Sequence, residues 1–179
     1  MDTQDARIEE LRRAAVADPR NGEIRYLLGA ELAQQRRYDE AVLELSAAVA
    51  LNPLLHTARL QLGLLHLTMA QTQHASAVLA PLESLEDDSG LKHFKRGLDA
   101  LMVDDLHASA ASIEHGIELN SENPPLNADM RMLLGRIKDT ISKNEAQSAN
   151  GIAPTNADAA KTGSQPVHTD FSLYGVTRH

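Results

Sequence analysis

The chain has 179 residues and a net charge of −8; 42% of its residues are hydrophobic, only 3% are aromatic, and none is cysteine. This composition favours packed helices over a β-sandwich, which needs more β-branched and aromatic residues. The absence of cysteine excludes disulfides and thiolate-bound metals. The acidic balance argues against a nucleic-acid partner, because phosphate binding needs clustered lysine and arginine.

The first residues, MDTQDARIEE, are polar and acidic. They lack the basic and apolar regions of a signal peptide, and no apolar run approaches the roughly 20 residues of a membrane helix. We therefore expect a cytoplasmic protein without membrane insertion. Residues 5–18 predict a first helix that caps one end of the repeats described next.

The sequence repeats at a constant interval. Small residues recur in equal steps at Gly29, Gly63 and Gly97, and with the same step the segment LRRAAVADP at 11–19 matches LSAAVALNP at 45–53. Small residues allow two helices to approach closely, and a proline such as the one that ends 45–53 stops the second helix. One pair cannot bury its apolar face alone, so the recurrence predicts stacked helix pairs.

This pattern resembles the tetratricopeptide repeat family, whose period is 34 residues, over about residues 5–144. The second repeat, 56–89, departs from the family at Pro81, which predicts an early end of its second helix. The third repeat, 90–123, departs at Arg96, where the family has an apolar residue. The first repeat, 22–55, fits the family at these positions: Leu28, Gly29, Leu32, Tyr38, Ala41, Leu45, Ala48 and Pro53. The resemblance implies an all-α right-handed solenoid of about three helix pairs with N- and C-terminal capping helices.

A last helix is predicted from about Asn127 to Lys143, with Asn127 as its N-terminal cap. Its apolar stripe at helical spacing would close the stack: Met130, Leu133, Leu134, Ile137 and Ile141. After Ala146 the residues become small and polar, which predicts a disordered linker. We therefore expect a repeat domain at 1–146 and a tail at 147–179.

Apolar side chains return within the final segment VHTDFSLYGVTRH and form a candidate docking peptide: Phe171, Leu173, Tyr174 and Val176. Three interpretations stay open: the peptide docks on another protein, it folds back into the chain's own groove, or it has no partner. A flexible linker of about 25 residues spans roughly 25 to 30 Å, so self-binding is within reach.

In the family, the first helices of successive repeats line a concave groove that binds peptides. The resemblance places an apolar trough there: Tyr26, Leu60, Leu64, Leu67, Phe94, Leu98, Leu101 and Met102. Such a trough would take an apolar peptide or helix of a partner protein. A place in the core is the competing interpretation, favoured for the residues of the third repeat and disfavoured for those of the second.

Other functional patterns are weak. Some family members grip a partner's C-terminal carboxylate, but of the matching positions only Lys95 carries the required charge. His66 and His74 are eight residues apart, as are His107 and His115, which is too far to share a metal ion on one straight helix. We expect no metal, no cofactor and no catalytic residue.

The sequence therefore predicts a protein-interaction module, an adaptor or chaperone that binds an apolar peptide or helix of a partner. In size, acidity and repeat number it resembles the tetratricopeptide chaperones of bacterial secretion systems. The alternative is an assembly or regulatory subunit of a larger complex, for secretion or envelope biogenesis, anchored through its C-terminal peptide. The oligomeric state is not indicated.

Overall fold

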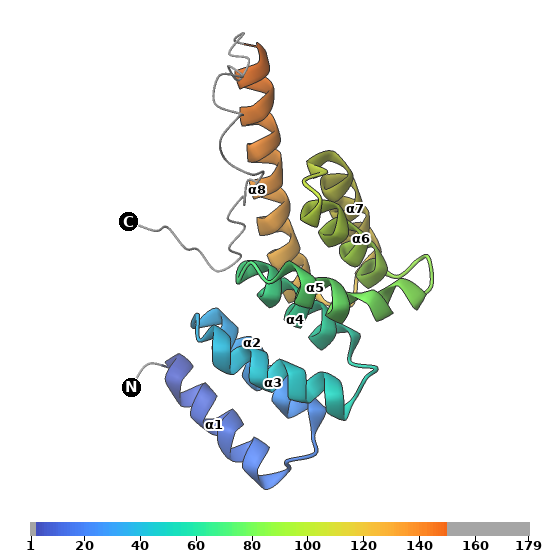
Figure 1. The fold of residues 1–179 in the computed structure, drawn as a ribbon. Helices are drawn as coiled ribbons and strands as arrows, with labels where there is room; N and C mark the ends of the chain where they lie inside the picture. Colours follow the sequence, from blue (N-terminus) through green and yellow to red (C-terminus); the bar gives the residue numbers. More distant parts are fainter. Residues whose placement is uncertain (1–2, 150–179) are drawn as a thin grey trace.

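The computed structural model describes residues 3–149, and every secondary-structure element in this part of the chain is a helix, which confirms the predicted all-α class (Figure 1). No helix in it is long and apolar enough to span a membrane. The elements in chain order are α1 (Thr3–Ala17), α2 (Gly22–Gln34), α3 (Tyr38–Leu51), α4 (His56–Thr68), α5 (Thr72–Leu79), the 3₁₀ helix η1 (Ala80–Ser84), α6 (Gly90–Met102), α7 (Leu106–Leu119) and α8 (Pro124–Ala149).

The helices keep the register of the sequence repeat. Helices α2, α4, α6 and α8 begin at residues 22, 56, 90 and 124. Helix α2 packs against α3, α4 against α5, and α6 against α7, while α1 packs against α2 as the second helix of an incomplete unit. The predicted repeat boundaries are confirmed, and α8 takes the place of the first helix of a fourth unit.

Close approach within each pair depends on a glycine of the first helix. A Cβ atom on that glycine would come within 2.5 to 2.7 Å of a large side chain on the second helix: Gly29 against Leu45, Gly63 against Leu79, and Gly97 against Ile113. Real Cβ contacts are longer, so no larger residue fits without a shift of its neighbour. The regular spacing of the glycines is thus the spacing of these three contacts.

Helix α4 separates two apolar cores. Its Leu62 and Leu65 belong to the core shared with α1, α2 and α3, whereas Leu60 and Leu64 belong to the core shared with α5 to α8. A helix that buries two faces has few positions left for polar side chains. This explains why the centre of α4 is a nearly continuous apolar run.

Pro81 ends the second helix of its repeat early, as predicted. Helix α5 has 8 residues against 14 in α3 and in α7, and η1 continues the chain from Ala80. Proline has no N–H to donate and its ring obstructs the preceding turn. The loop that follows is fastened by Lys92, whose Nζ donates to the carbonyl of Leu85 and to the carboxylate of Asp87, both at 2.8 Å.

The start of α8 differs from the prediction. The helix begins at Pro124, where a missing N–H matters least, and the Asn123 side chain accepts a hydrogen bond from Leu126 N at 3.1 Å. Asn127 is therefore not the cap. Its amide is buried and donates to the carbonyl of Asn120 at 2.6 Å, at the end of α7.

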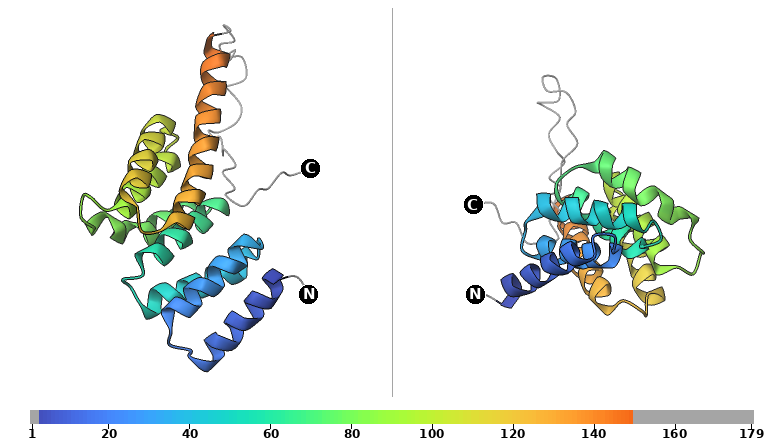
Figure 2. Two further views of the ribbon diagram at one scale, coloured as in Figure 1. Left: turned by 180° about the vertical axis from the view of Figure 1, so that it is seen from behind. Right: turned by 90° about the horizontal axis from the view of Figure 1, so that it is seen from below.

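Helix α8 also runs to Ala149, beyond both the predicted end at Lys143 and the expected domain boundary at 146. Figures 1 and 2 show its C-terminal half projecting past α6 and α7, with α1 to α3 at the other end of the molecule. The predicted docking peptide lies outside the described residues: Phe171, Leu173, Tyr174 and Val176.

Candidate binding site

The predicted apolar trough is closed by the protein itself, because five of its eight residues are buried: Leu60, Leu64, Phe94, Leu98 and Leu101. The expectation that Leu60 and Leu64 lie open is wrong, whereas Phe94, Leu98 and Leu101 follow the competing interpretation, a place in the core. The reason is α8, whose apolar stripe belongs to the same core: Leu126, Met130, Leu133 and Ile137. The stripe was predicted correctly, but the core that it shares with the trough residues of α4 and α6 was not.

The first turns of α8 also reach the neighbourhood of α2. Burial, and after it the carboxylate of Asp129 on α8, raise the pKa of Tyr26 on α2. Burial likewise raises the pKa of Asp129. Tyr26, Leu67 and Met102 stay partly exposed, and a role for these three in partner binding stays a prediction.

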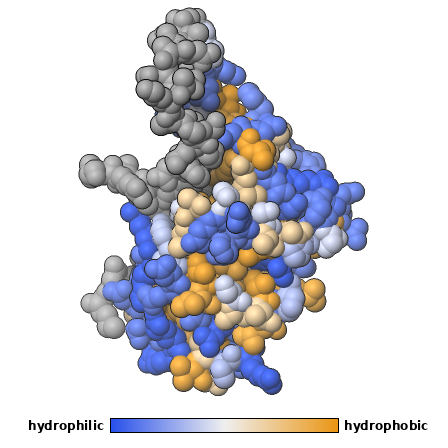
Figure 3. Space-filling model, in the orientation of Figure 1, coloured by the Kyte–Doolittle hydropathy of each residue, from blue (hydrophilic) through white to orange (hydrophobic). Residues whose placement is uncertain are grey.

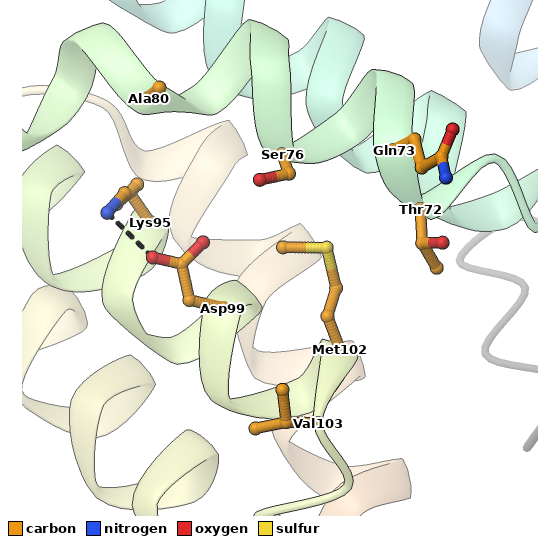
Figure 4. Close-up of a pocket in the computed structure, with 8 residues that line it drawn as sticks. All are labelled: Thr72, Gln73, Ser76, Ala80, Lys95, Asp99, Met102 and Val103. Atoms are coloured by element: carbon orange, nitrogen blue, oxygen red, sulfur yellow. Dashed lines mark ion pairs between the residues drawn. The ribbon is translucent and has the colours of Figure 1, made fainter. Parts of the chain in front are cut away.

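An open pocket lies between α5 and α6 (Figure 4). It has a volume of about 400 Å³ and is lined by Thr72, Gln73, Ser76, Ala80, Lys95, Asp99, Met102 and Val103. The wall from α5 carries hydroxyl and amide groups. The opposite wall, from the end of α6, carries an ion pair beside a methionine and a valine.

Charge replaces apolar packing at the boundary of the two repeats near this pocket. Leu28, Leu62 and Met130 occupy one repeat position and are buried, whereas Arg96 at the same position of the third repeat is exposed. Its guanidinium instead pairs with Glu83 of η1 at 2.7 Å. The sequence shows that Arg96 departs from the repeat, but it does not show that Arg96 pairs with Glu83.

The carboxylate of Glu83 joins η1 to two cations of α6. Hydrogen bonds from Arg96 and then Lys95 lower the pKa of Glu83 to about 2. Lys95 Nζ lies 2.9 Å from Glu83 and 2.6 Å from Asp99. Ion pairs therefore hold the two repeats together along the pocket.

The charges of the pocket wall are already paired. Burial by itself would lower the pKa of Lys95, but hydrogen bonds to Asp99 and Glu83 outweigh it, so the pKa is raised and the ammonium stays charged. Since two carboxylates hold Lys95, it does not offer a free cation for a partner's carboxylate. The lining therefore favours a ligand group without net charge.

The histidines pair across helices rather than along them. The rings of His66 on α4 and His74 on α5 are stacked with centroids 5.4 Å apart. His93 and His115 meet edge to face at 4.4 Å, a contact that sequence spacing could not reveal because the two lie on different helices. Between residues 3 and 149, no three His, Asp or Glu side chains are grouped as metal ligands.

Comparison with known proteins informs the fold alone. No family model matches the chain, and no curated protein matches it. Among solved structures, it is similar to MamA from Desulfovibrio magneticus RS-1, residues 41 to the end, with a TM-score of 0.55 and 19% identity over 83% of this chain and 81% of that chain. It is equally similar to the MamA RS-1 ArsTM double mutant, at a TM-score of 0.55 and 19% identity over 83% of this chain and 80% of the other. These similarities, with the regular register of the helix pairs, show a fold of the tetratricopeptide type.

Proposed function

We propose that the chain is a non-catalytic adaptor that binds an extended segment of another protein in the pocket between α5 and α6. The observation that carries this proposal is the pocket itself, which is built where the repeat pattern is interrupted. Its volume of about 400 Å³ falls within the range of about 300 to 1,000 Å³ that is usual for ligand sites.

The lining indicates the chemistry of the bound segment. The side chains of Thr72, Gln73 and Ser76 can donate to peptide carbonyls and accept from peptide N–H groups. Met102 is flexible and Val103 is exposed, so the facing wall suits one apolar side chain. The ligand we propose is a short, extended and uncharged stretch with one apolar residue.

This proposal keeps the predicted function, binding of a partner protein, but places the binding site in the pocket between α5 and α6 and not in the apolar trough. The apolar trough is filled by α8, and of the trough residues only Met102 lines the pocket. An adaptor or chaperone working in the cytoplasm remains our proposal. The alternative, an assembly subunit held through residues 171–176, remains a prediction about a segment outside the described residues.

Selection of peptides from a displayed random library, against the full chain, tests the proposal. Selected peptides are then measured by fluorescence anisotropy on the chain and on the Ser76→Tyr variant, whose larger side chain fills the pocket. We expect an affinity loss of at least about tenfold, or about 1.4 kcal/mol.

The matched control is Ala77→Tyr, an exposed neighbour that does not line the pocket. It should bind the selected peptides as the unchanged chain does. Equal losses in the two variants, or selected peptides that ignore Ser76→Tyr, would contradict a site between α5 and α6.

A further inference from the structure

The outward face of α3 exposes large apolar side chains. Leu43 is 70% exposed, Leu54 is 75% exposed, and Leu51 lies between them at 41%. In Figure 3 apolar residues gather over the lower part of the molecule, where α1 to α3 lie. We call this face the α3 stripe, which consists of Leu43, Ser46, Ala47, Ala50, Leu51 and Leu54.

The sister repeats show that the fold does not need Leu43 and Leu54. In the second and third repeats, the position of Leu43 is held by Ala77 and Ala111, and the position of Leu54 by Asp88 and Glu122. Single exposed apolar residues are ordinary, but Leu43 and Leu51 of α3 together with Leu54 of the turn that follows it form a patch. Leu51 is matched by the half-buried Leu85 and Leu119, so Leu43 and Leu54 are the large apolar residues that only the first repeat has on this face, and they give it a role beyond holding its own helix pair.

We propose that the α3 stripe binds the α3 stripe of a second copy of this chain, with the two helices antiparallel and the two-fold axis near Ala47. Positions at equal distance from Ala47 then face each other, so Leu43 of one copy meets Leu51 of the other. The small Ser46 and Ala50 beside the axis allow the two helices to approach closely.

The charges at the two ends of the stripe favour this orientation. Asp39 lies exposed at the beginning of α3 and has no cation partner within residues 3–149. Arg59 lies near the other end, where its guanidinium donates only to the carbonyls of Pro53 and Val78, each at 3.4 Å. Antiparallel pairing brings Asp39 of each copy toward Arg59 of the other.

A parallel arrangement is disfavoured by the same charges. Helix α3 contains Asp39, Glu40 and Glu44 and no basic residue, so parallel pairing would place like charges together. Antiparallel pairing sets the acidic half of each helix against the uncharged half of the other and opposes the two helix dipoles. The stripe is therefore self-complementary in one orientation only.

The absence of cysteine from the chain makes a cross-linking test clean. Ser46→Cys places one thiol close to the proposed axis, and oxidation by diamide, which takes up the two thiol hydrogens, joins two such thiols as a disulfide. The control is Ala80→Cys, an exposed residue at the same position of the second repeat. We expect a covalent dimer from Ser46→Cys and at least about tenfold less from Ala80→Cys; equal yields would overturn the proposal.

Sedimentation of the full chain gives the second readout. We expect the unchanged chain to approach twice its 19.4 kDa mass as its concentration rises to about 100 micromolar. Leu43→Glu should raise the dissociation constant at least about tenfold, whereas Ala111→Glu, at the equivalent position of the third repeat, should leave it unchanged. A chain that stays monomeric, or a dimer that survives Leu43→Glu, overturns the proposal.

The test is independent of the peptide pocket. Leu43 and the pocket residues lie on different repeats, so Ser76→Tyr should leave the mass of the chain unchanged. Circular dichroism of Leu43→Glu confirms that the exposed substitution has kept the helices. Loss of the dimer with peptide binding retained would separate the two surfaces.

Discussion

A Cβ atom added to Gly63 would lie 2.5 Å from Cγ of Leu79, closer than side chains normally approach. Leu79 is fully buried, so any shift of its side chain disturbs the core around it. We therefore expect Gly63→Ala to lower the free energy of unfolding by about 1 to 3 kcal/mol, since overpacking outweighs the better helix propensity of alanine. Urea unfolding followed by circular dichroism measures this change.

Gly135 offers the matched control, because nothing lies within 4 Å of the Cβ that an alanine would add there. It sits inside α8, so Gly135→Ala should raise the free energy of unfolding by about 0.5 to 1 kcal/mol. The two glycine substitutions thus have opposite expected signs. A stabilised Gly63→Ala would show that the close contact with Leu79 does not limit the helix pair.

These contacts explain why so much of the fold could be predicted from the sequence. Each glycine contacts a large residue of the second helix in its own pair. The glycines recur at a constant interval in the sequence because the same contact recurs in every helix pair. Pro81 could be interpreted equally well, because a proline beyond the first turn interrupts a helix. Local chemistry determined both features, and both were predicted correctly.

The position of α8 could not be predicted in the same way. The spacing of Met130, Leu133 and Ile137 shows that one face of the helix is buried, but it does not show what covers that face. Leu60 and Leu64 were expected to be open for the same reason, since their cover comes from residues far along the chain. The start of α8 was missed because Asn123 and Asn127 both have side chains that can cap a helix.

The surroundings of the pocket likewise depend on a contact between residues on different elements. Arg96 was visible as a departure from the repeat, and Pro81 as a break, but the sequence does not indicate that Glu83 lies beside Arg96. Once η1 turns Glu83 toward α6, its ion pairs with Lys95 and Arg96 join the second and third repeats next to the pocket. The contact between His93 and His115 could not be predicted either, because it also joins two different helices.

Asn127 should be a strong structural residue although it is not a cap. Its side chain donates to the carbonyl of Asn120 at 2.6 Å and accepts from the amide of Asn120 at 2.8 Å, in a buried position. Removing it takes two hydrogen bonds from the part-buried Asn120, which follows the end of α7, so Asn127→Ala should lower the free energy of unfolding by about 1 to 3 kcal/mol. Thermal and urea unfolding measure this, with the exposed Asn144→Ala as the control that should change little.

The lowered pKa of Glu83 should make the stability of the fold fall as the pH is lowered. Its pKa is lowered from 4.5 to about 2 by the hydrogen bonds from Arg96 and Lys95. A carboxyl group whose pKa is lower in the folded state stabilises the fold above its unfolded pKa, and this stabilisation is lost as the pH falls through the folded pKa. Its full contribution is therefore present above pH 4.5 and disappears on descent toward pH 2.

Glu83→Gln makes this contribution measurable. The urea midpoint of the variant should lie below that of the unchanged chain at pH 6, and the gap should narrow between pH 4.5 and pH 2. Glu86→Gln serves as the control, because Glu86 is exposed and has no ion pair within the described residues. A gap that is the same at every pH would contradict a stabilising role for the ionised Glu83.

The coupling between Tyr26 and Asp129 tests whether α8 lies near α2. Burial raises the pKa of Tyr26 above 10.0 and the Asp129 carboxylate raises it further. In Asp129→Asn the second cause is removed, so the pKa of Tyr26 should fall while staying above 10.0, because burial remains. The measurement is a pH titration of ¹³C-labelled tyrosine rings by NMR, with each of the three tyrosines assigned by replacement with phenylalanine. Asp139→Asn, an exposed change on the same helix, should leave Tyr26 unaffected, and an unchanged Tyr26 in Asp129→Asn would mean that α8 does not lie near α2 in solution.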